Sequence, residues 1–281
     1  MHPFITFVGR EIPVYGLMAL LGALFAFASA RVVLLMKGKT APEVRRESEF
    51  PLAQLFAIAA ALVGAVALGP IKNLFYLLIH PSIMSGYTFW EYLRTIFGEI
   101  IFFGGVIGGF AGMLIYRRIF AAKLRPMLDI SAVGVSLGHA VGRVGCYFAG
   151  CCYGIEVHAE NPLALVYPAP PLHYPASAPP GVPLLNIPLM ESGFLLLLHG
   201  ILVAVYLRTR RRGLTAGLYL LLYALWRFVI EFYRGDTLRG EYFGLSTSQY
   251  ISLAAAAVGL WLIFGRESRR TRLPHSKHHA A

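Results

Sequence analysis

Two pairs of ionisable residues lie in apolar stretches with a spacing that suits binding of an anion. His139 and Arg143 are four residues apart, and so are Arg227 and Glu231. Residues four apart share one face of a helix. A guanidinium group binds phosphate through two parallel hydrogen bonds. The two pairs therefore place two candidate phosphate ligands on helix faces.

Arg143 has no acidic residue within one turn on its own helix. It needs an anion from another segment, and Glu191 and Glu99 are candidates. A phosphate is the third candidate, which we favour over a purely structural pair. Arg227 and Glu231 can pair with each other. The alternative for them is a buried ion pair that only fixes helix packing.

The cysteines and glycines cluster around Arg143. Cys146, Cys151 and Cys152 fall within seven residues. A disulfide to Cys146 is conceivable, whereas a closed zinc site needs about four ligands. We therefore expect no metal and no cofactor, and we expect buried thiols rather than a thiol-redox centre. The pair Gly104 and Gly105, in another stretch, is typical of close packing between membrane helices.

These residues belong to a chain with the composition of an integral membrane protein. Hydrophobic residues make up 57% and charged residues 14%, where an ordinary globular domain has about 25% charged residues. We predict an all-α fold with seven transmembrane helices, each of the ~20 residues that a bilayer requires. We expect one domain over residues 1–281, without a cleaved signal peptide. The predicted spans are residues 12–36, 51–71, 97–116, 126–149, 189–207, 214–233 and 246–265.

Lysine and arginine predict the orientation of these spans. The segments 37–46, 117–125, 208–212 and 266–277 hold 17 of the 25 cationic residues, and 151–188 holds none. Cytoplasmic loops carry such an excess. The N-terminus is therefore expected outside and the C-terminus in the cytoplasm. The net charge of +11 then reflects topology and anionic lipid rather than nucleic acid, which we exclude as a partner.

The predicted spans bring the ionisable groups to one depth. At about 1.5 Å per residue, Arg143, Arg227 and Glu231 lie near the outer ends of their helices. Glu191 and Glu99 lie near the outer starts of theirs. Ionisable groups inside a membrane face a bundle interior or an aqueous cavity. We therefore expect one polar cavity, open to the outside or to the outer leaflet.

Three segments lie outside the predicted spans. Residues 72–96 hold an aromatic cluster that suits an interfacial arm, either as an ordinary aromatic belt or as the border of a lateral entrance for lipid. Residues 156–188 hold nine of the 17 prolines, and we expect no regular helix or sheet there. Residues 266–281 are expected to be a cytoplasmic tail.

Several motifs resemble those of the prolipoprotein diacylglyceryl transferase family of bacteria. The segments that carry the resemblance are residues 12–18, 104–109, 142–154 and 227–236, together with Gln249. The segments around Arg143 and Arg227 are specific, whereas a Gly-Gly segment alone would be weak. The resemblance covers most of the chain.

The resemblance implies an activity, its partners and a place in the cell. The diacylglyceryl group of phosphatidylglycerol would pass to the thiol of a lipobox cysteine in a prolipoprotein signal peptide. The enzyme would be a multi-pass protein of the bacterial cytoplasmic membrane, with its site toward the outer leaflet and with membrane lipid around it. The catalytic residues would be Arg143, Arg227 and Glu231, to which we add His139 because it shares a helix face with Arg143. The substrate-binding residues would be Tyr15, Gly104, Gly105, Gly142, Gly145, Gly154, Glu191, Arg234 and Gln249.

The chain departs from the family pattern at positions that bear on chemistry. Phe103 stands where the family usually has histidine, Cys146 where it has asparagine, and Cys151 where it has glutamate. His139 is our candidate for the missing general base; the alternative is a histidine that only bonds a neighbouring helix. The alternative function is a phospholipid-binding relative that is inactive or differently specific. A transporter is disfavoured because only Asp129 lies near the inner ends of the spans.

Overall fold

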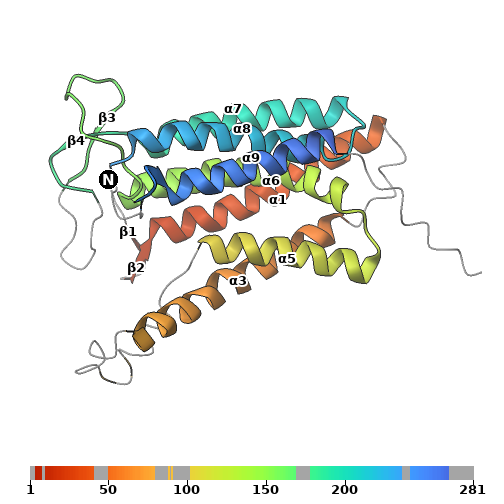
Figure 1. The fold of residues 1–281 in the computed structure, drawn as a ribbon, viewed down its shortest axis with the longest axis horizontal. Helices are drawn as coiled ribbons and strands as arrows, with labels where there is room; N and C mark the ends of the chain where they lie inside the picture. The colour runs from red at the N-terminus through yellow and green to blue at the C-terminus, as the bar shows by residue number, and fades with distance from the viewer. Residues whose placement is uncertain are drawn as a thin grey trace, which may run out of the picture.

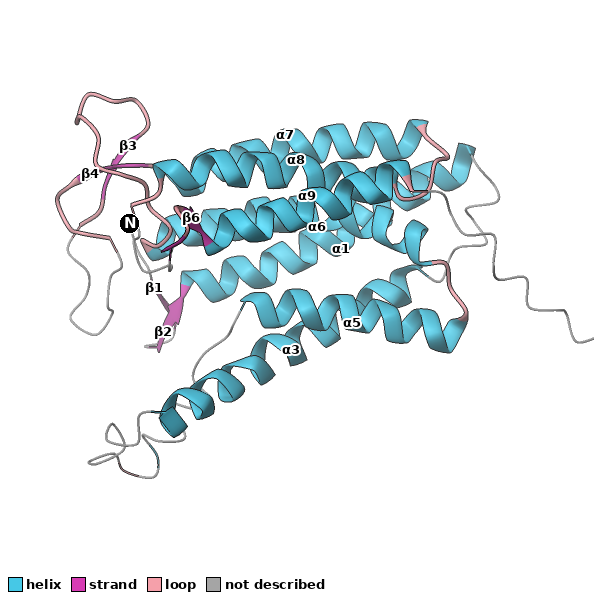
Figure 2. Ribbon diagram, viewed as in Figure 1, coloured by secondary structure: helices cyan, strands magenta, loops and turns pink. Residues whose placement is uncertain are grey.

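The computed structural model describes residues 4–7, 10–40, 50–79, 88, 90, 102–168, 178–235 and 241–265. Long helices dominate this part of the chain (Figures 1 and 2). The helices are α1 (Val14–Thr40), α3 (Phe50–Ile79), α5 (Phe102–Phe120), α6 (Leu124–Ala149), α7 (Ile187–Arg208), α8 (Leu214–Ile230) and α9 (Thr247–Phe264). A 3-10 turn, η2 (Glu231–Tyr233), continues α8. The strands are β1 (Phe4–Phe7), β2 (Arg10–Pro13), β3 (Ala164–Val166), β4 (Pro183–Leu185), β5 (Glu241–Tyr242) and β6 (Leu245–Ser246).

The long apolar helices of the described residues are typical of an all-α membrane protein. Five of its helices are long and apolar enough to cross a bilayer. They correspond to the first, second, fifth, sixth and seventh predicted spans. The third and fourth predicted spans also form helices, α5 and α6. Within the described residues, the strands pair as three antiparallel two-stranded ribbons.

Two predicted boundaries differ from the structure by five residues or more. Helix α3 does not stop at residue 71 but runs through Pro70 to Ile79, so it includes the first part of the expected arm 72–96. Helix α5 begins at Phe102 rather than at 97. The sixth span ends in η2 because the last residues tighten into a 3-10 turn, which is common at helix ends. Glu99, most of the arm and the tail lie outside the described residues.

The prediction that residues 156–188 hold no regular structure was wrong. Strands β3 and β4 pair there, with Ala164 opposite Leu185 and Val166 opposite Pro183. Pro183 is tolerated because it is the first residue of its strand, where a missing N–H group costs little. On its other edge β4 accepts and donates backbone bonds with Ile155 and Val157. The ribbon therefore forms a small cap at the end of α6.

Glycine contacts explain how the helices pair. A Cβ on Gly138 of α6 would lie 2.6 Å from the carbonyl oxygen of Gly22 in α1, and one on Gly217 of α8 would lie 2.8 Å from that of Gly259 in α9. Gly104 of α5 meets the α3 backbone in the same way. Small residues at such points let membrane helices approach closely. In Figure 1 α3 diverges from the main bundle toward the lower left of the picture.

Helix α6 lies at the centre of the main bundle, because it packs against α1, α7 and α8. Its buried residues include Met127, Ile130 and Val133, which share a core with Leu195 and Leu198 of α7. The last turns of α6 carry the polar residues His139 and Arg143. This central position brings the end of α6 close to three neighbouring helices.

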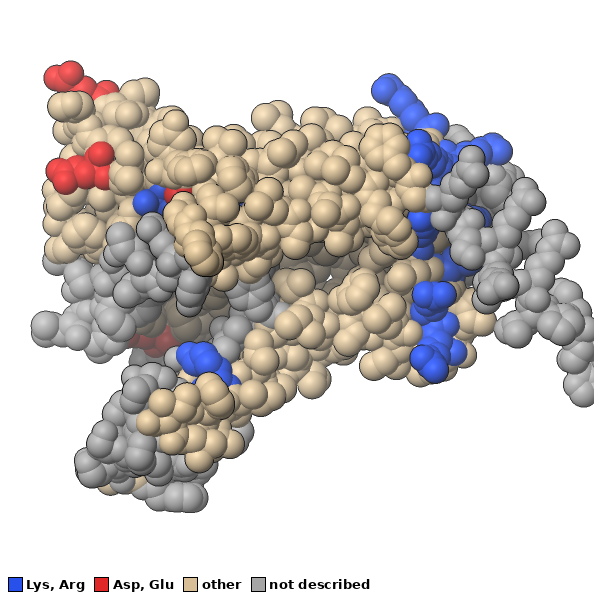
Figure 3. Space-filling view, viewed as in Figure 1, with Lys and Arg blue, Asp and Glu red and all other residues tan. Residues whose placement is uncertain are grey.

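The two ends of the bundle differ in charge. Most visible lysine and arginine side chains gather where α5 and α7 finish, which we call the cationic end (Figure 3). Here the carboxylate of Asp129 accepts hydrogen bonds from the first N–H groups of α8, at Gly213 (2.6 Å) and Ala216 (2.9 Å). The Lys37 ammonium donates to the carbonyls of Tyr206 and Thr209 at the end of α7. The opposite end, where α6 finishes beside β3 and β4, is called the ribbon end.

Candidate functional site

Arg143 lies in the last turns of α6, where it meets two neighbouring helices. Its Nη2 atom is 2.8 Å from Oε1 of Glu191, at the start of α7. The same nitrogen donates to the Tyr223 hydroxyl of α8 at 3.4 Å. Tyr223 in turn donates to Oε1 of Glu191 at 2.6 Å. Glu191 is fully buried, so this pair is shielded from water and fixes the guanidinium group firmly.

His139 joins the same network one turn earlier on α6. Its Nδ1 atom is 3.2 Å from the Tyr219 hydroxyl, and its Nε2 atom is 3.5 Å from the Tyr223 hydroxyl. The imidazole also packs edge-on against the Tyr223 ring. A proton can therefore pass between His139 and the surroundings of Arg143 through Tyr223.

Arg227 and Glu231 form the ion pair that their spacing predicts, with 2.5 Å between Nη2 and Oε2. Arg234 approaches the same Oε2 atom, with its Nε atom 3.8 Å away. The N-terminus of α9 joins the pair. The Ser246 hydroxyl donates to Glu231 at 2.8 Å, and Arg227 donates to the Ser248 hydroxyl at 3.2 Å.

The cap at the ribbon end positions Arg234. The backbone of Gly154 forms a bridge with Arg234, and the N–H of Gly235 donates to the Tyr153 carbonyl at 3.1 Å. A Cβ on Gly154 would lie 2.7 Å from the Cβ of Leu185. Only glycine fits this close approach of two backbones. Gly154 therefore allows the close backbone contact that positions Arg234.

Arg143 and Arg227 each keep a buried N–H group without a hydrogen-bond partner. The two nitrogen atoms are Nε of Arg143 and Nη1 of Arg227. A buried donor that stays unsatisfied costs about 1–3 kcal/mol, more when it is charged. Among the described residues, the three guanidinium groups of Arg143, Arg227 and Arg234 pair with two carboxylates, those of Glu191 and Glu231. An anionic ligand would accept hydrogen bonds from these N–H groups and would balance the excess positive charge.

The remaining predicted residues take several positions. Tyr15 lies against Gly145, whose Cβ would come within 3.4 Å of the Tyr15 ring. A Cβ on Gly142 would meet nothing within 4 Å, so this position borders open space. Gly104 and Gly105 lie at the α3–α5 interface rather than beside Arg143.

Gln249 is a helix cap in the structure. Its side chain accepts from the Ser246 N–H at 2.9 Å, while its own N–H donates to the Ser246 hydroxyl. This reciprocal arrangement is a capping box. Gln249 therefore orients Ser246, which holds Glu231.

Sequence reasoning missed the hydroxyl groups of the site. Tyr219, Tyr223, Ser246 and Ser248 carry no charge at neutral pH, so a search for ionisable groups inside spans passes over them. A signal was present nevertheless. Tyr219 and Tyr223 stand eight and four residues before Arg227, on the same face of α8.

The three cysteines meet beside this network. None forms a disulfide, and Cys146 is buried. Their Sγ atoms all lie within 4.8 Å of one another. The Tyr167 ring packs beside Gly150 in the same turn. Burial raises the pKa of the Tyr167 hydroxyl, and the neighbouring Cys151 raises it further.

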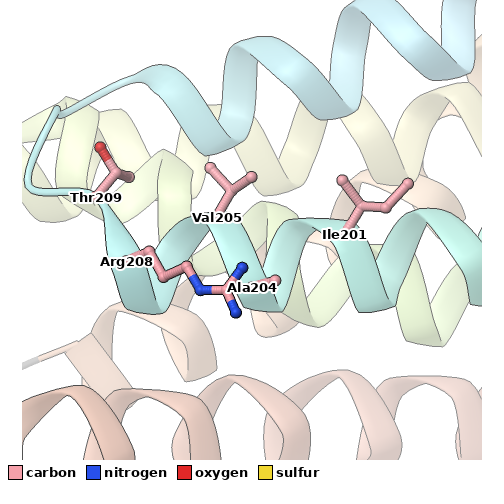
Figure 4. Close-up of a pocket in the computed structure, with 5 residues that line it drawn as sticks. All are labelled: Ile201, Ala204, Val205, Arg208 and Thr209. Carbon is pink, nitrogen blue, oxygen red and sulfur yellow. The ribbon is translucent and has the colours of Figure 1, made fainter.

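An apolar depression at the cationic end contributes none of this chemistry. Its lining residues come from the last turns of α7 and the residue after it (Figure 4): Ile201, Ala204, Val205, Arg208 and Thr209. Seventeen residues of helix separate Arg208 from Glu191, or about 25 Å. The polar groups around Arg143 thus form the candidate site.

Comparisons with known proteins agree with this geometry. Residues 3–265 match the family described as prolipoprotein diacylglyceryl transferase. The phosphatidylglycerol–prolipoprotein diacylglyceryl transferase of Clostridium tetani is 29% identical over 90% of this chain and 93% of its own. The second such enzyme of Clostridium perfringens is 28% identical over 90% and 91%. That of Gloeobacter violaceus is 32% identical over 84% and 85%. Because the match covers nearly the whole chain, this protein belongs to the prolipoprotein diacylglyceryl transferase family.

Proposed function

We propose that this protein transfers the diacylglyceryl group of phosphatidylglycerol to the thiol of a lipobox cysteine in bacterial prolipoproteins. The observation that carries the proposal is the pair of buried, partnerless N–H groups on Arg143 and Arg227. They lie where a phosphate would be held between α6 and α8. The names of the relatives supply the substrates, and the guanidinium groups supply the matching chemistry.

The site would face the outer leaflet of the bacterial cytoplasmic membrane. All seven long helices would cross the membrane, with the N-terminus outside and the C-terminus in the cytoplasm. The charge asymmetry of Figure 3 supports this arrangement, because cytoplasmic ends of membrane proteins are rich in lysine and arginine. Phosphatidylglycerol and the signal peptide would both reach Arg143 from the ribbon end.

The reaction is a substitution at a glycerol carbon. The substrate sulfur forms a bond to that carbon, the bond from carbon to the phosphate oxygen breaks, and glycerol phosphate leaves with the electron pair. Arg143 and Arg227, with Arg234 beside them, would stabilise the charge that grows on the leaving phosphate. Glu191 and Glu231 would hold these guanidinium groups in place. His139 would take the thiol proton through Tyr223.

A transfer assay tests the proposal. Purified protein in detergent is mixed with phosphatidylglycerol and a lipobox peptide, and mass spectrometry detects a diacylglyceryl adduct on the peptide cysteine. We expect an adduct with the parent protein and none with Arg143→Ala. A control peptide with serine in place of cysteine should stay unmodified. A parent protein that binds phosphatidylglycerol but forms no adduct would contradict the proposal.

A further inference from the structure

The three thiols at the end of α6 form a compact group that the phosphate-binding network does not use. Cys146 is buried, and Cys151 and Cys152 are half-buried. Their Sγ atoms lie within 4.8 Å of one another. Sulfur ligands sit about 2.3 Å from zinc, which puts them about 3.8 Å apart in a tetrahedral site. A shift of about 1 Å would bring these atoms to that separation.

The backbone is shaped to gather these thiols. Gly150 ends α6 in the left-handed conformation, with φ of 68°, and the N–H of Cys151 reaches back to the Cys146 carbonyl at 3.2 Å. Cys152 also has a positive φ, 62°. This conformation is uncommon for a residue other than glycine and carries strain. The chain thus folds back so that Cys151 and Cys152 approach the preceding helical turn.

The surroundings of the group suit a metal thiolate. The Tyr167 hydroxyl is buried without a hydrogen-bond partner, and the Tyr167 ring lies against Gly150, the residue before Cys151. Such a hydroxyl can donate to a coordinated sulfur, as outer groups around metal ligands do. Arg143 and Arg234 act electrostatically on Cys152. A zinc ion with three thiolates carries one net negative charge, which these cations offset.

We propose that Cys146, Cys151 and Cys152 bind one zinc ion whose fourth position takes the sulfur of the substrate cysteine. This inference rests on the proposed function and adds the means by which that thiol is activated. The group contains no fourth histidine, cysteine or carboxylate among the described residues. Structural zinc sites have four protein ligands, whereas three ligands leave a position for water or substrate.

The chemistry follows from the position of the group. A thiol bound to zinc is present as the thiolate, and thiolate is the nucleophile. The proton released on binding passes through Tyr223 to His139. The zinc-bound sulfur then attacks the glycerol carbon, and the phosphate oxygen leaves with the bonding electrons toward Arg143. Cys146 and Arg143 are three residues apart on α6, so the nucleophile and the leaving group are held one turn apart. No oxidant or reductant is needed.

Metal content tests the site without reference to activity. The full-length protein is purified under reducing conditions without chelator, and its zinc content is measured by inductively coupled plasma mass spectrometry. We expect about one zinc per chain. Cys146→Ser, Cys151→Ser and Cys152→Ser should each weaken zinc binding by about tenfold or more. Cys151→His, which keeps a ligand, should retain zinc. Ile155→Ser, a change of an exposed side chain in the same segment, should also retain it.

Cobalt substitution tests the open position. The visible absorption of Co²⁺ in place of zinc should report a tetrahedral site with three thiolates, and a lipobox peptide should change it. The same peptide with serine in place of cysteine should leave the spectrum unchanged. A spectrum that responds to neither peptide would overturn the role of the fourth position.

Transfer activity separates this inference from the proposed function. Chelation should abolish transfer and added zinc should restore it, while Arg143→Ala should keep zinc and lose transfer. Transfer by a zinc-free protein, or by the triple serine variant at the parent rate, would overturn the zinc site and leave the transferase intact. Zinc binding without any transfer by the parent would instead overturn the transferase and, with it, the activation of its substrate.

Discussion

Arg143 owes its position to its partners rather than to its own helix. Glu191 and Tyr223 hold one side of its guanidinium group, while the buried Nε atom stays unsatisfied. A buried charge that keeps a spare donor is costly in a purely structural ion pair. The same arrangement is useful in an enzyme, because the group is fixed before its ligand arrives.

Arg143→Lys should lower kcat/KM for transfer about 100-fold, although the charge is kept. Lysine presents a point charge in place of the planar fork that binds phosphate and carboxylate together. Steady-state kinetics with phosphatidylglycerol and a lipobox peptide would measure the change. Arg210→Lys, at an exposed position of the cationic end, is the matched control and should behave as the parent does. Parent-like kinetics for Arg143→Lys would show that bidentate binding is not needed.

Tyr223→Phe and His139→Gln should slow transfer by similar factors, and the double variant should be no slower than the worse single variant. The reason is that His139 reaches the Arg143 network through the Tyr223 hydroxyl. Residues that act as one unit are not additive. Single-turnover rates of the three variants would measure the coupling. If the losses in rate were additive, the two residues would act independently, and the proton transfer through Tyr223 to His139 would be contradicted.

At the scale of elements, the sequence predicted the ends of a helix well where a residue such as glycine stops the helix. Helix α6 was expected at 126–149 and is found at Leu124–Ala149, because Gly150 supplies a left-handed end. Helix α3 is longer than predicted because it continues through Pro70. Neighbouring helices and local adjustment can satisfy the backbone groups that a proline frees in a membrane helix.

The site was predicted only in part, for physical reasons. The depth of Arg143 and Glu191 follows from counting along helices, so their meeting was foreseeable. The sequence did not predict which helices are neighbours, because charges at equal depth do not specify how helices pack. The bonds from Ser246 to Glu231 and from Tyr223 to Glu191 depend on that packing. The strand β4 was missed because its proline is the first residue of the strand, a position that tolerates proline.

Gly64→Val should destabilise the α3–α5 pair. A Cβ at Gly64 would clash with the carbonyl oxygen of Gly104, and overpacking of this kind costs about 1–3 kcal/mol. We expect a lower thermal unfolding midpoint in a fixed detergent. Gly200→Ala is the matched control, because nothing lies within 4 Å of its Cβ. An unchanged midpoint for Gly64→Val would mean that the pair does not depend on this contact.

At the scale of the whole molecule, the two ends of the bundle have different tasks. The cationic end closes the helices, with Asp129 and Lys37 satisfying backbone groups at the ends of α8 and α7. The ribbon end carries Arg143, the thiols and a cap that holds Arg234. Under the proposed function, anchoring and chemistry are therefore separated along the length of the bundle.

This separation predicts the accessibility of each end in an intact cell. Glu160→Cys places a thiol on an exposed position of the ribbon end, and Arg210→Cys does the same at the cationic end. A membrane-impermeant maleimide should label Glu160→Cys in intact spheroplasts and should label Arg210→Cys only after permeabilisation. The parent protein, with its own cysteines, gives the background. The reverse pattern would turn the molecule over and place Arg143 at the cytoplasmic leaflet, where a signal peptide's cysteine could not meet phosphatidylglycerol from outside.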